Sequence, residues 1–101
     1  KPYLNENLTL KELADKLETT PNNLSQIINE MFSRNFYEFI NEYRINEVKS
    51  LLTNTKYSHY SMLGIAFECG FNSKSTFNSV FKQFTGKTPS EFKKSAFDLS
   101  E

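Results

Sequence analysis

The sequence predicts an all-α domain of about seven helices, in which two similar short helical units flank one long helix. Apolar residues recur at three- and four-residue intervals along most of the 101 residues, which is the spacing of one face of a helix. Proline and glycine number three each, too few for a chain rich in β-turns. The layout of the first half also returns about 52 residues later.

The first unit contains two predicted helices. Thr9 and Glu12 have the spacing of a capping box, in which the hydroxyl and the carboxylate each accept a backbone N–H of the first turn. The apolar side of this helix is expected to be Leu10, Leu13, Ala14 and Leu17. Thr20 and Pro21 start the second helix, because threonine is a favoured N-cap and proline suits the first helical position. Its predicted buried face is Leu24, Ile27, Ile28 and Met31, and Asn35 suits a left-handed residue after its end.

A long helix is predicted over residues 36–52. Its apolar positions are Phe36, Phe39, Ile40, Tyr43, Val48, Leu51 and Leu52. At 1.5 Å per residue this helix is about 25 Å long. Arg44 lies beside the apolar seam, where it could pair internally with a carboxylate such as Glu47 or Glu12 or contact a phosphate, and we expect the internal pair. Residues 54–60 form a polar link to the second unit.

The second unit repeats this plan. Ser61 is the expected cap of a helix over 62–69 that buries Met62, Ile65, Ala66 and Cys69. Gly70 suits the positive φ that follows a helix. Asn72 and Ser73 are candidate caps for a helix over 74–84, whose inner face is Phe77, Val80, Phe81 and Phe84. Gly86 ends it, and a short last helix with Pro89, Phe92 and Phe97 is expected to fray after Lys94.

The two units match position by position. A shift of 52 carries Thr9 to Ser61 and Leu13 to Ile65, and a shift of 53 carries Leu24 to Phe77, Ile28 to Phe81 and Glu38 to Glu91. Glu38 and Glu91 are therefore expected to stabilise the starts of equivalent helices through the helix dipole. Two copies are too few for a solenoid. We predict one domain over 1–101, with helix-turn-helix units at 7–35 and 61–94 joined by the linker helix 36–53.

Charge and composition exclude several classes. Twelve basic and twelve acidic residues give no net charge, which alone argues against nucleic acid. However, the stretch from Lys56 to Lys94 carries six basic and two acidic side chains, so a basic face is possible. One cysteine excludes an internal disulfide and, with no long apolar run, favours a cytoplasmic domain. The chain begins at Lys1 without methionine, so we expect it to be part of a longer protein.

The sequence offers no catalytic or metal-binding constellation. His59 has no second ligand at a metal-binding spacing and is expected on the surface of the link. Cys69 lies on an inner helix face and is interpreted as a small buried hydrophobe rather than a nucleophile. The phenylalanines, at helical spacing, are interpreted as core. We therefore expect no enzyme activity, no metal and no cofactor.

The outer faces of the two second helices suggest a function. In a helix-turn-helix the second helix can enter a DNA major groove, which is about 12 Å wide. The outward residues are Asn22, Ser25, Gln26 and Asn29 in the first unit and Lys74, Ser75, Thr76, Asn78 and Ser79 in the second. Such side chains hydrogen-bond to base edges. A polar surface that happens to be low in charge is the alternative for one helix, but its recurrence on both favours base contact.

A longer pattern in the second half strengthens this interpretation. It consists of Ile65, Ala66, Cys69, Gly70, Phe71, Ser73, Ser75, Phe77, Phe81, Lys82, Gly86, Pro89, Ser90 and Phe92. With Leu24-Ser25, Phe36, Tyr43-Arg44-Ile45 and Leu51-Leu52, it resembles the AraC/XylS family of transcription regulators over about residues 7–94. The chain departs from the family pattern at Asn35, where glycine is usual, and at Phe92-Lys93-Lys94.

The resemblance implies two helix-turn-helix subdomains that enter successive major-groove segments of double-stranded DNA. By motif position, the base contacts it implies fall on Asn22, Ser25, Gln26, Lys74, Ser75, Thr76, Asn78 and Ser79. We expect phosphate contacts from Thr20, Arg34, Lys56, Ser61, Ser73, Lys82 and Lys87. The alternative is a helical module that docks a protein such as RNA polymerase through the acidic first half. Dimerisation, where it occurs, is expected to use an upstream domain.

Overall fold

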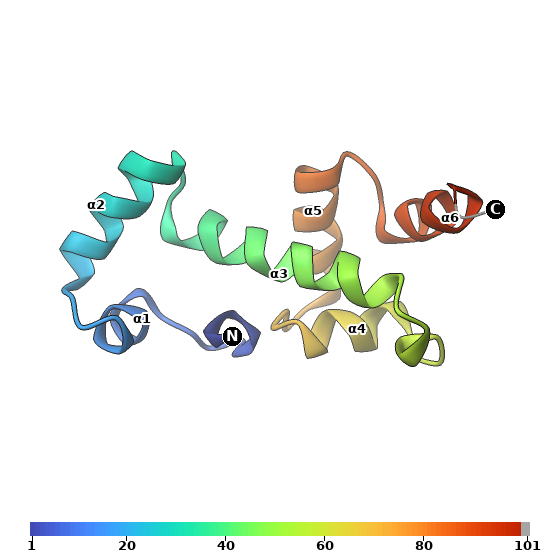
Figure 1. Ribbon diagram of the computed structural model, residues 1–101, viewed down its shortest axis with the longest axis horizontal. Coiled ribbons are helices and arrows are strands. Elements are labelled where there is room, and N and C mark those ends of the chain that lie inside the picture. The colour runs from blue at the N-terminus through green and yellow to red at the C-terminus, as the bar shows by residue number, and fades with distance from the viewer. Residues whose placement is uncertain (100–101) are drawn as a thin grey trace.

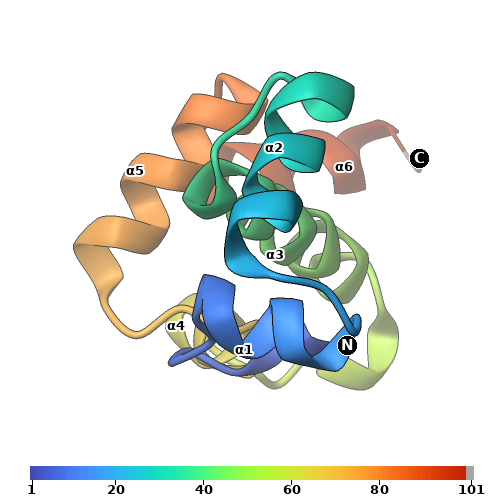
Figure 2. The same ribbon diagram turned by 90° about the vertical axis from the view of Figure 1, so that its left-hand side faces the viewer.

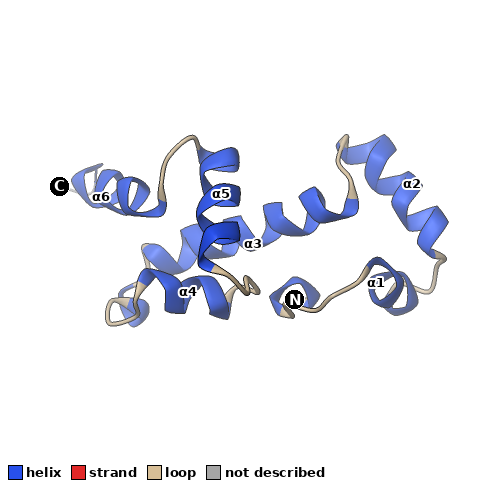
Figure 3. Cartoon of the chain, turned by 180° about the vertical axis from the view of Figure 1, so that it is seen from behind, coloured by secondary structure: helices blue, strands red, loops and turns tan. Residues whose placement is uncertain are grey.

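The computed structural model describes the backbone of residues 1–99 and the side chains of residues 1–95, and this part of the chain is helical without strands (Figures 1 and 3). The elements are η1 (Pro2–Leu4), α1 (Leu10–Lys16), α2 (Pro21–Phe32), α3 (Phe36–Leu52), η2 (Thr55–Tyr57), α4 (Met62–Glu68), α5 (Lys74–Thr85) and α6 (Pro89–Leu99). The predicted all-α fold class is confirmed, with six α-helices and two short 3₁₀ helices in the described residues.

The duplication is visible in the helix lengths. α1 and α4 have 7 residues each, and α2 and α5 have 12 each. α3 runs along the long axis of the molecule and connects the two units (Figure 1). α1 and α4 lie toward one edge, whereas α2 and α5 lie toward the opposite edge (Figures 1 and 2). The two second helices are therefore presented on the same edge of an elongated molecule, 46 × 23 × 23 Å in extent.

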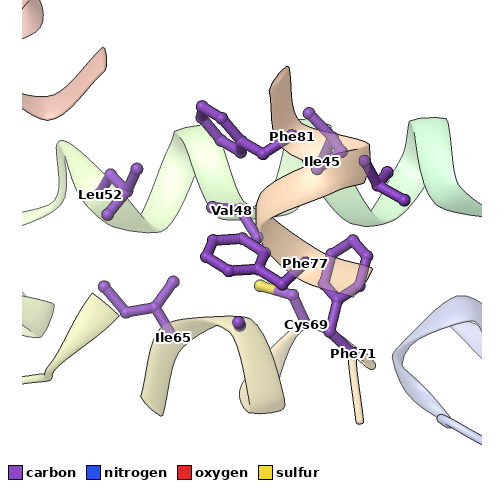
Figure 4. Packing of buried hydrophobic residues seen from close by; sticks show 10 residues of the cluster. Ile45, Val48, Leu52, Ile65, Cys69, Phe71, Phe77 and Phe81 are labelled. Atoms are coloured by element: carbon purple, nitrogen blue, oxygen red, sulfur yellow. The ribbon is translucent and has the colours of Figure 1, made fainter. Parts of the chain in front are cut away.

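Each unit has its own core, and α3 contributes to both. The first core contains Leu8, Leu13, Ala14, Leu24, Ile28 and Ile40. The second contains Ile45, Val48, Leu52, Ile65, Ala66, Cys69, Phe71, Phe77, Val80 and Phe81. In the second core, the rings of Phe77 and Phe81 lie beside Val48 and Ile45 of α3 (Figure 4). α3 thus holds the two units together because its apolar side chains are shared between them.

The predicted side-chain caps at Thr20, Ser61 and Ser73 are confirmed. Each hydroxyl accepts the backbone N–H three residues on, at 3.2 Å, 2.9 Å and 3.2 Å respectively. Thr9 likewise accepts the N–H of Glu12 at 3.1 Å. The hydrogen bonds of the described residues do not include the return bond from the Glu12 carboxylate, so only half of that predicted capping box forms. Local capping therefore determines where α2, α4 and α5 begin.

Complete capping boxes form instead at the starts of α3 and α6. Asn35 Oδ1 accepts the N–H of Glu38 at 2.8 Å, and the Glu38 carboxylate accepts the N–H of Asn35 at 3.1 Å. Thr88 and Glu91 exchange the same pair of bonds at 3.2 Å and 3.0 Å. These bonds confirm that the two glutamates stabilise helix starts. The Thr88 bonds also lower the pKa of Glu91.

The prediction of a left-handed Asn35 is wrong. Asn35 has φ −87° and is the extended N-cap of α3, because its amide oxygen is needed by the first turn. The left-handed residue is Ser33, with φ 52°. Ser33 stands 53 residues before Gly86, whose φ is 76°. The two units therefore end their second helices at the same backbone position, although only the second unit has a glycine there.

A second left-handed residue, Glu18, was not predicted. Its φ is 57°, and it stands 52 residues before Gly70, whose φ is 96°. The turn of the first unit therefore has a positive φ at the same position as the turn of the second, but without the glycine that suits it. A residue with a Cβ carries a strain of about 1–2 kcal/mol in this region.

Glu18→Gly is accordingly expected to raise the free energy of unfolding, by about 1 kcal/mol. Glu30→Gly is the matched control, because Glu30 is exposed within α2 and glycine in a helix interior costs about 1 kcal/mol. Urea denaturation of both variants should give changes of opposite sign. Loss of stability in both would contradict the strain assigned to the turn.

Several apolar positions predicted to be inside are exposed. In α2, Leu24 and Ile28 are buried, but Ile27 and Met31 are 45% and 73% exposed. Leu17, which follows α1, and Tyr43 of α3 are also exposed, by 58% and 45%. The predicted faces are too wide because the first core is small: it consists of Leu8 of the N-terminal segment and five residues of α1, α2 and α3. Met62, Phe84 and Leu51 are partly buried against the second core, as are Phe36 and Phe39 against the first.

The last helix is longer than predicted. α6 runs from Pro89 to Leu99, so the helix continues beyond Lys94, where it was expected to fray. Phe92 packs partly against the second core, with its ring centroid 5.5 Å from that of Phe81. The side chain of Phe97 lies outside the described residues. α6 therefore joins the second unit through Phe92 and the Thr88–Glu91 cap.

Arg44 is internal, as predicted, but its partners differ. Its Nε donates to the backbone oxygen of Tyr3 at 2.7 Å, Nη2 donates to that of Asn5 at 2.9 Å, and Nη1 donates to Asn41 Oδ1 at 3.4 Å. Within the described residues no carboxylate pairs with it, so the predicted pairing with Glu47 or Glu12 is wrong. The reason is that the N-terminal segment, residues 1–8, covers this part of α3.

Glu47 instead binds two side chains of the N-terminal segment. Its carboxylate lies 2.9 Å from Lys1 Nζ and accepts the Tyr3 hydroxyl at 3.2 Å. The hydrogen bond from Lys1 lowers the pKa of Glu47. Leu4 packs against the second core, whereas Leu8 is part of the first. The N-terminal segment therefore spans the junction between the two units.

Candidate nucleic-acid interface

The outer face of α2 carries the amide and hydroxyl groups expected there. Asn22, Gln26 and Asn29 are exposed and Ser25 is half-buried. Gln26 Nε2 donates to Glu30 Oε1 at 3.0 Å, one turn further along the helix. This pair is solvent-exposed, so the Gln26 amide can exchange it for another partner at little cost.

The outer face of α5 is the equivalent surface of the second unit. Lys74, Ser75, Asn78 and Ser79 are exposed, and Thr76 is half-buried. A groove of about 760 Å³ runs along this helix between the starts of α4 and α6. Its lining brings together five residues predicted to contact DNA, namely Ser61, Lys74, Asn78, Ser79 and Lys82.

A second hollow lies on the other side of α5. It has a volume of about 460 Å³ and is lined by Ser75, Thr76, Ser79, Val80, Gln83 and Tyr37. Tyr37 belongs to the start of α3 and is 58% exposed. The sequence analysis did not select Tyr37 as a site residue. Its position between the apolar residues Phe36 and Phe39 offered no signal, because only the packing of α5 across α3 brings it to this surface (Figure 3).

The starts of the two second helices suit an anionic partner. The first turns of α2 and α5 contain no acidic residue, whereas those of α1, α3 and α6 contain Glu12, Glu38 and Glu91. Free backbone N–H groups and the helix dipole make such ends attractive to phosphate. The capping hydroxyls of Thr20 and Ser73, predicted as phosphate contacts, stand at these two ends.

The predicted phosphate-binding cations fall into two groups. Lys56, Lys82 and Lys87 are exposed, and Lys87 Nζ donates to Ser95 Oγ at 3.2 Å. Arg34 instead contacts other residues of the domain. Its Nε lies 3.3 Å from Glu42 Oε2, and its guanidinium lies 5.3 Å from the centre of the Phe84 ring. Arg34 therefore links the loop after α2 to α5 of the other unit.

The remaining chemistry-bearing residues lie away from these faces. Cys69 is fully buried in the second core, and its burial raises the pKa of the thiol to about 12, so it is unreactive as a nucleophile. His59 is exposed in the link. The described residues contain no group of three histidine, cysteine, aspartate or glutamate side chains that could hold a metal ion. None of the helices in that part of the chain has the length and apolar character needed to cross a membrane.

The structure has two helix-turn-helix units joined by one helix, and the second helix of each unit carries hydrogen-bonding side chains on its outer face. This arrangement defines a class of DNA-binding domain. A family model described as a helix-turn-helix domain matches residues 13–95 of the chain. The chain belongs to the AraC-type helix-turn-helix family of transcription regulators.

Curated relatives agree with this assignment. The chain is 32% identical over 91 residues to an uncharacterized helix-turn-helix-type transcriptional regulator of Staphylococcus aureus (strain COL), covering 90% of this chain and 12% of the relative. It is 31% identical over 87 residues to the melibiose operon regulatory protein of Escherichia coli (strain K12), covering 86% of this chain and 28% of the relative. The chain thus spans a small part of the length of either relative.

Solved structures share the fold. A DNA-binding transcriptional dual regulator from Escherichia coli K-12 superposes with a TM-score of 0.78 at 25% identity, covering 91% of this chain and 79% of that one. The C-terminal domain of AraT, a response regulator from Geobacillus stearothermophilus, has a TM-score of 0.78 at 22% identity, covering 92% and 74%. The latter likeness concerns the fold alone.

Proposed function

We propose that this domain binds double-stranded DNA with sequence preference, with α2 and α5 in successive major-groove segments. The observation that carries the proposal is the repeated presentation of one surface: two 12-residue helices, on the same edge of the molecule, each with an outer face of amide and hydroxyl groups. Groove segments on one side of B-DNA recur about every 34 Å. A domain 46 Å long is large enough to span two of them.

In this proposal the base contacts come from the outer faces. Asn and Gln of α2 suit the bidentate recognition of adenine, and Lys74 of α5 suits guanine. The N-caps of α2, α4 and α5 and the exposed lysines Lys56, Lys82 and Lys87 hold the phosphates and set the register. The domain acts as the output of a longer, cytoplasmic transcription regulator, in which other segments provide the signal and any dimer contact.

The first experiment is selection of the domain against a random-sequence duplex pool, followed by sequencing. Two enriched patches about one helical turn apart would support two base-reading helices. One patch would show that a single unit reads bases and that the other only anchors. Absence of enrichment together with absence of binding at low salt would contradict the proposal.

Docking of a protein partner is the second candidate. It is favoured by the apolar surface that the end of α2 leaves in solvent, where Met31 and Phe32 are 73% and 49% exposed. Salt separates the two functions, since phosphate contacts release counterions and DNA affinity falls with ionic strength. Because the domain has few cations, we expect a shallow slope, equivalent to about three to five phosphates at about 0.9 each. Binding through an apolar surface should change little over the same range.

Lys74→Ala is expected to weaken binding to the selected duplex by about 1–3 kcal/mol and to relax preference at one or two base pairs. Gln26→Ala should do the same within the other patch. Lys16→Ala is the matched control, because Lys16 is an exposed lysine at the end of α1. Fluorescence anisotropy with the selected duplex and its single-base variants gives the affinities. Equal affinities and preferences for Lys74→Ala and the wild type would show that α5 is placed wrongly.

A further inference from the structure

A small cavity lies at the junction of the two units. It has a volume of about 170 Å³ and is enclosed by the N-terminal segment, α3 and the turn that leads into α5. Its polar lining consists of Glu6, Tyr37, Asn41, Arg44, Asn72 and Thr76. Since one water occupies about 30 Å³ of liquid, the cavity is larger than a single buried water requires.

Asn41 provides an unused hydrogen-bond donor in this lining. The residue is 2% exposed. Its Oδ1 accepts Arg44 Nη1, which fixes the orientation of the amide, and its Nδ2 has no partner among the described residues. An unpaired buried donor costs about 1–3 kcal/mol. Nδ2 has under 1 Å² of accessible surface, so an acceptor in the cavity reaches it only if the side chains of the lining shift.

Arg44 adds a positive charge that the exposed carboxylate of Glu6 offsets only in part. It is 9% exposed, and its three hydrogen bonds all go to neutral oxygens. No salt bridge of the described residues includes it. The start of α5, which contributes Thr76 to the lining, has no acidic residue in its first turn. Glu6 is the acidic lining residue; it is exposed, and its charge opposes the lowering of the Arg44 pKa that burial causes.

We propose that this cavity binds an oxygen of a phosphate group, with Asn41 Nδ2 as donor and Arg44 as the source of positive charge. In the DNA complex the group is a backbone phosphate between the two groove segments, because the cavity lies between the units that carry α2 and α5. This step rests on the proposed function. It makes the linker helix a third point of contact with DNA, which fixes the spacing of the two recognition helices.

The test uses duplexes of the selected sequence in which one phosphate at a time is replaced by a neutral methylphosphonate. For the wild type, replacement at one position between the two patches should weaken binding roughly tenfold or more, as expected for a charge-assisted hydrogen bond. Asn41→Asp should bind the unmodified duplex more weakly than the wild type. Replacement of the phosphate at that position should then cause this variant no further loss of affinity. Asn46→Asp, the same change at an exposed position of α3, should keep the wild-type profile.

The controls keep the outcomes distinct. Asn41→Ala removes the donor without adding charge and replaces Asn41→Asp if circular dichroism shows that the latter is unfolded. If an Asn41 variant loses the same affinity for every methylphosphonate duplex, the inference is overturned and the proposed function is left intact. A titration of the free protein with inorganic phosphate, followed through the Asn41 side-chain amide by NMR, tests whether the cavity binds free phosphate instead of a DNA phosphate. Binding of free phosphate without coupling to a DNA position would overturn the DNA assignment.

Discussion

Phe81→Ala is expected to unfold the second helix-turn-helix unit, with a loss of about 3–5 kcal/mol in the free energy of unfolding. Phe81 is fully buried, and its ring lies 5.8 Å from that of Phe77 and 5.5 Å from that of Phe92, measured between centroids. Truncation leaves a cavity among α3, α5 and α6 that the neighbouring rings cannot fill. The loss is comparable to the whole stability of a small domain. Urea denaturation followed by circular dichroism gives the free energy.

Phe67→Ala is the matched control for this prediction. Phe67 belongs to α4 in the same unit but is 50% exposed, so its truncation should cost well under about 1 kcal/mol. Similar losses in the free energy of unfolding for Phe81→Ala and Phe67→Ala would show that Phe81 is not a core residue of the second unit. DNA binding should fall with Phe81→Ala only as far as the folded fraction falls.

Gly70→Ala is expected to be almost as damaging, at about 2–4 kcal/mol. Two costs combine at this turn. The backbone of Gly70 has φ 96°, and a Cβ there would lie 2.4 Å from the backbone oxygen of Tyr3 and 2.8 Å from Arg44 Nε. The N-terminal segment must therefore move away, which breaks the hydrogen bond between Arg44 and Tyr3. Thermal and urea denaturation measure the loss.

Gly86→Ala separates the two costs. Gly86 also has a positive φ, 76°, but a Cβ at this position would meet no atom within 4 Å. Only the backbone strain remains, about 1 kcal/mol. The difference between the two variants is thus the cost of displacing the N-terminal segment. Equal losses at both glycines would contradict the close packing of the N-terminal segment against the turn.

The helical plan and its duplication could be predicted from the sequence with few errors. The long helix over residues 36–52 was predicted with its observed bounds, and the caps at Thr20, Ser61 and Ser73 form the expected hydrogen bonds. These features depend on contacts within about four residues along the chain, so the order of residues is enough to determine them. The outer faces of α2 and α5 follow from the same periodicity.

The errors have two sources. The periodicity of α2 assigns Ile27 and Met31 to the inside, but only the position of α3 decides that they remain in solvent. The left-handed residue was assigned to Asn35, but the capping box with Glu38 makes Asn35 the extended N-cap of α3. In the first case tertiary packing decides, whereas in the second a local alternative within the first turn of α3 decides.

The candidate site divides in the same way. The order of residues alone determines the two second helices, their caps and the amide and hydroxyl groups that face outward, because each depends on neighbours one helical turn away. Tertiary structure alone decides that Arg44 binds the backbone oxygens of Tyr3 and Asn5 rather than a carboxylate, and that Asn41 faces a cavity between the units. Burial removes water from these polar groups, so their partners are set by whichever distant segment covers them.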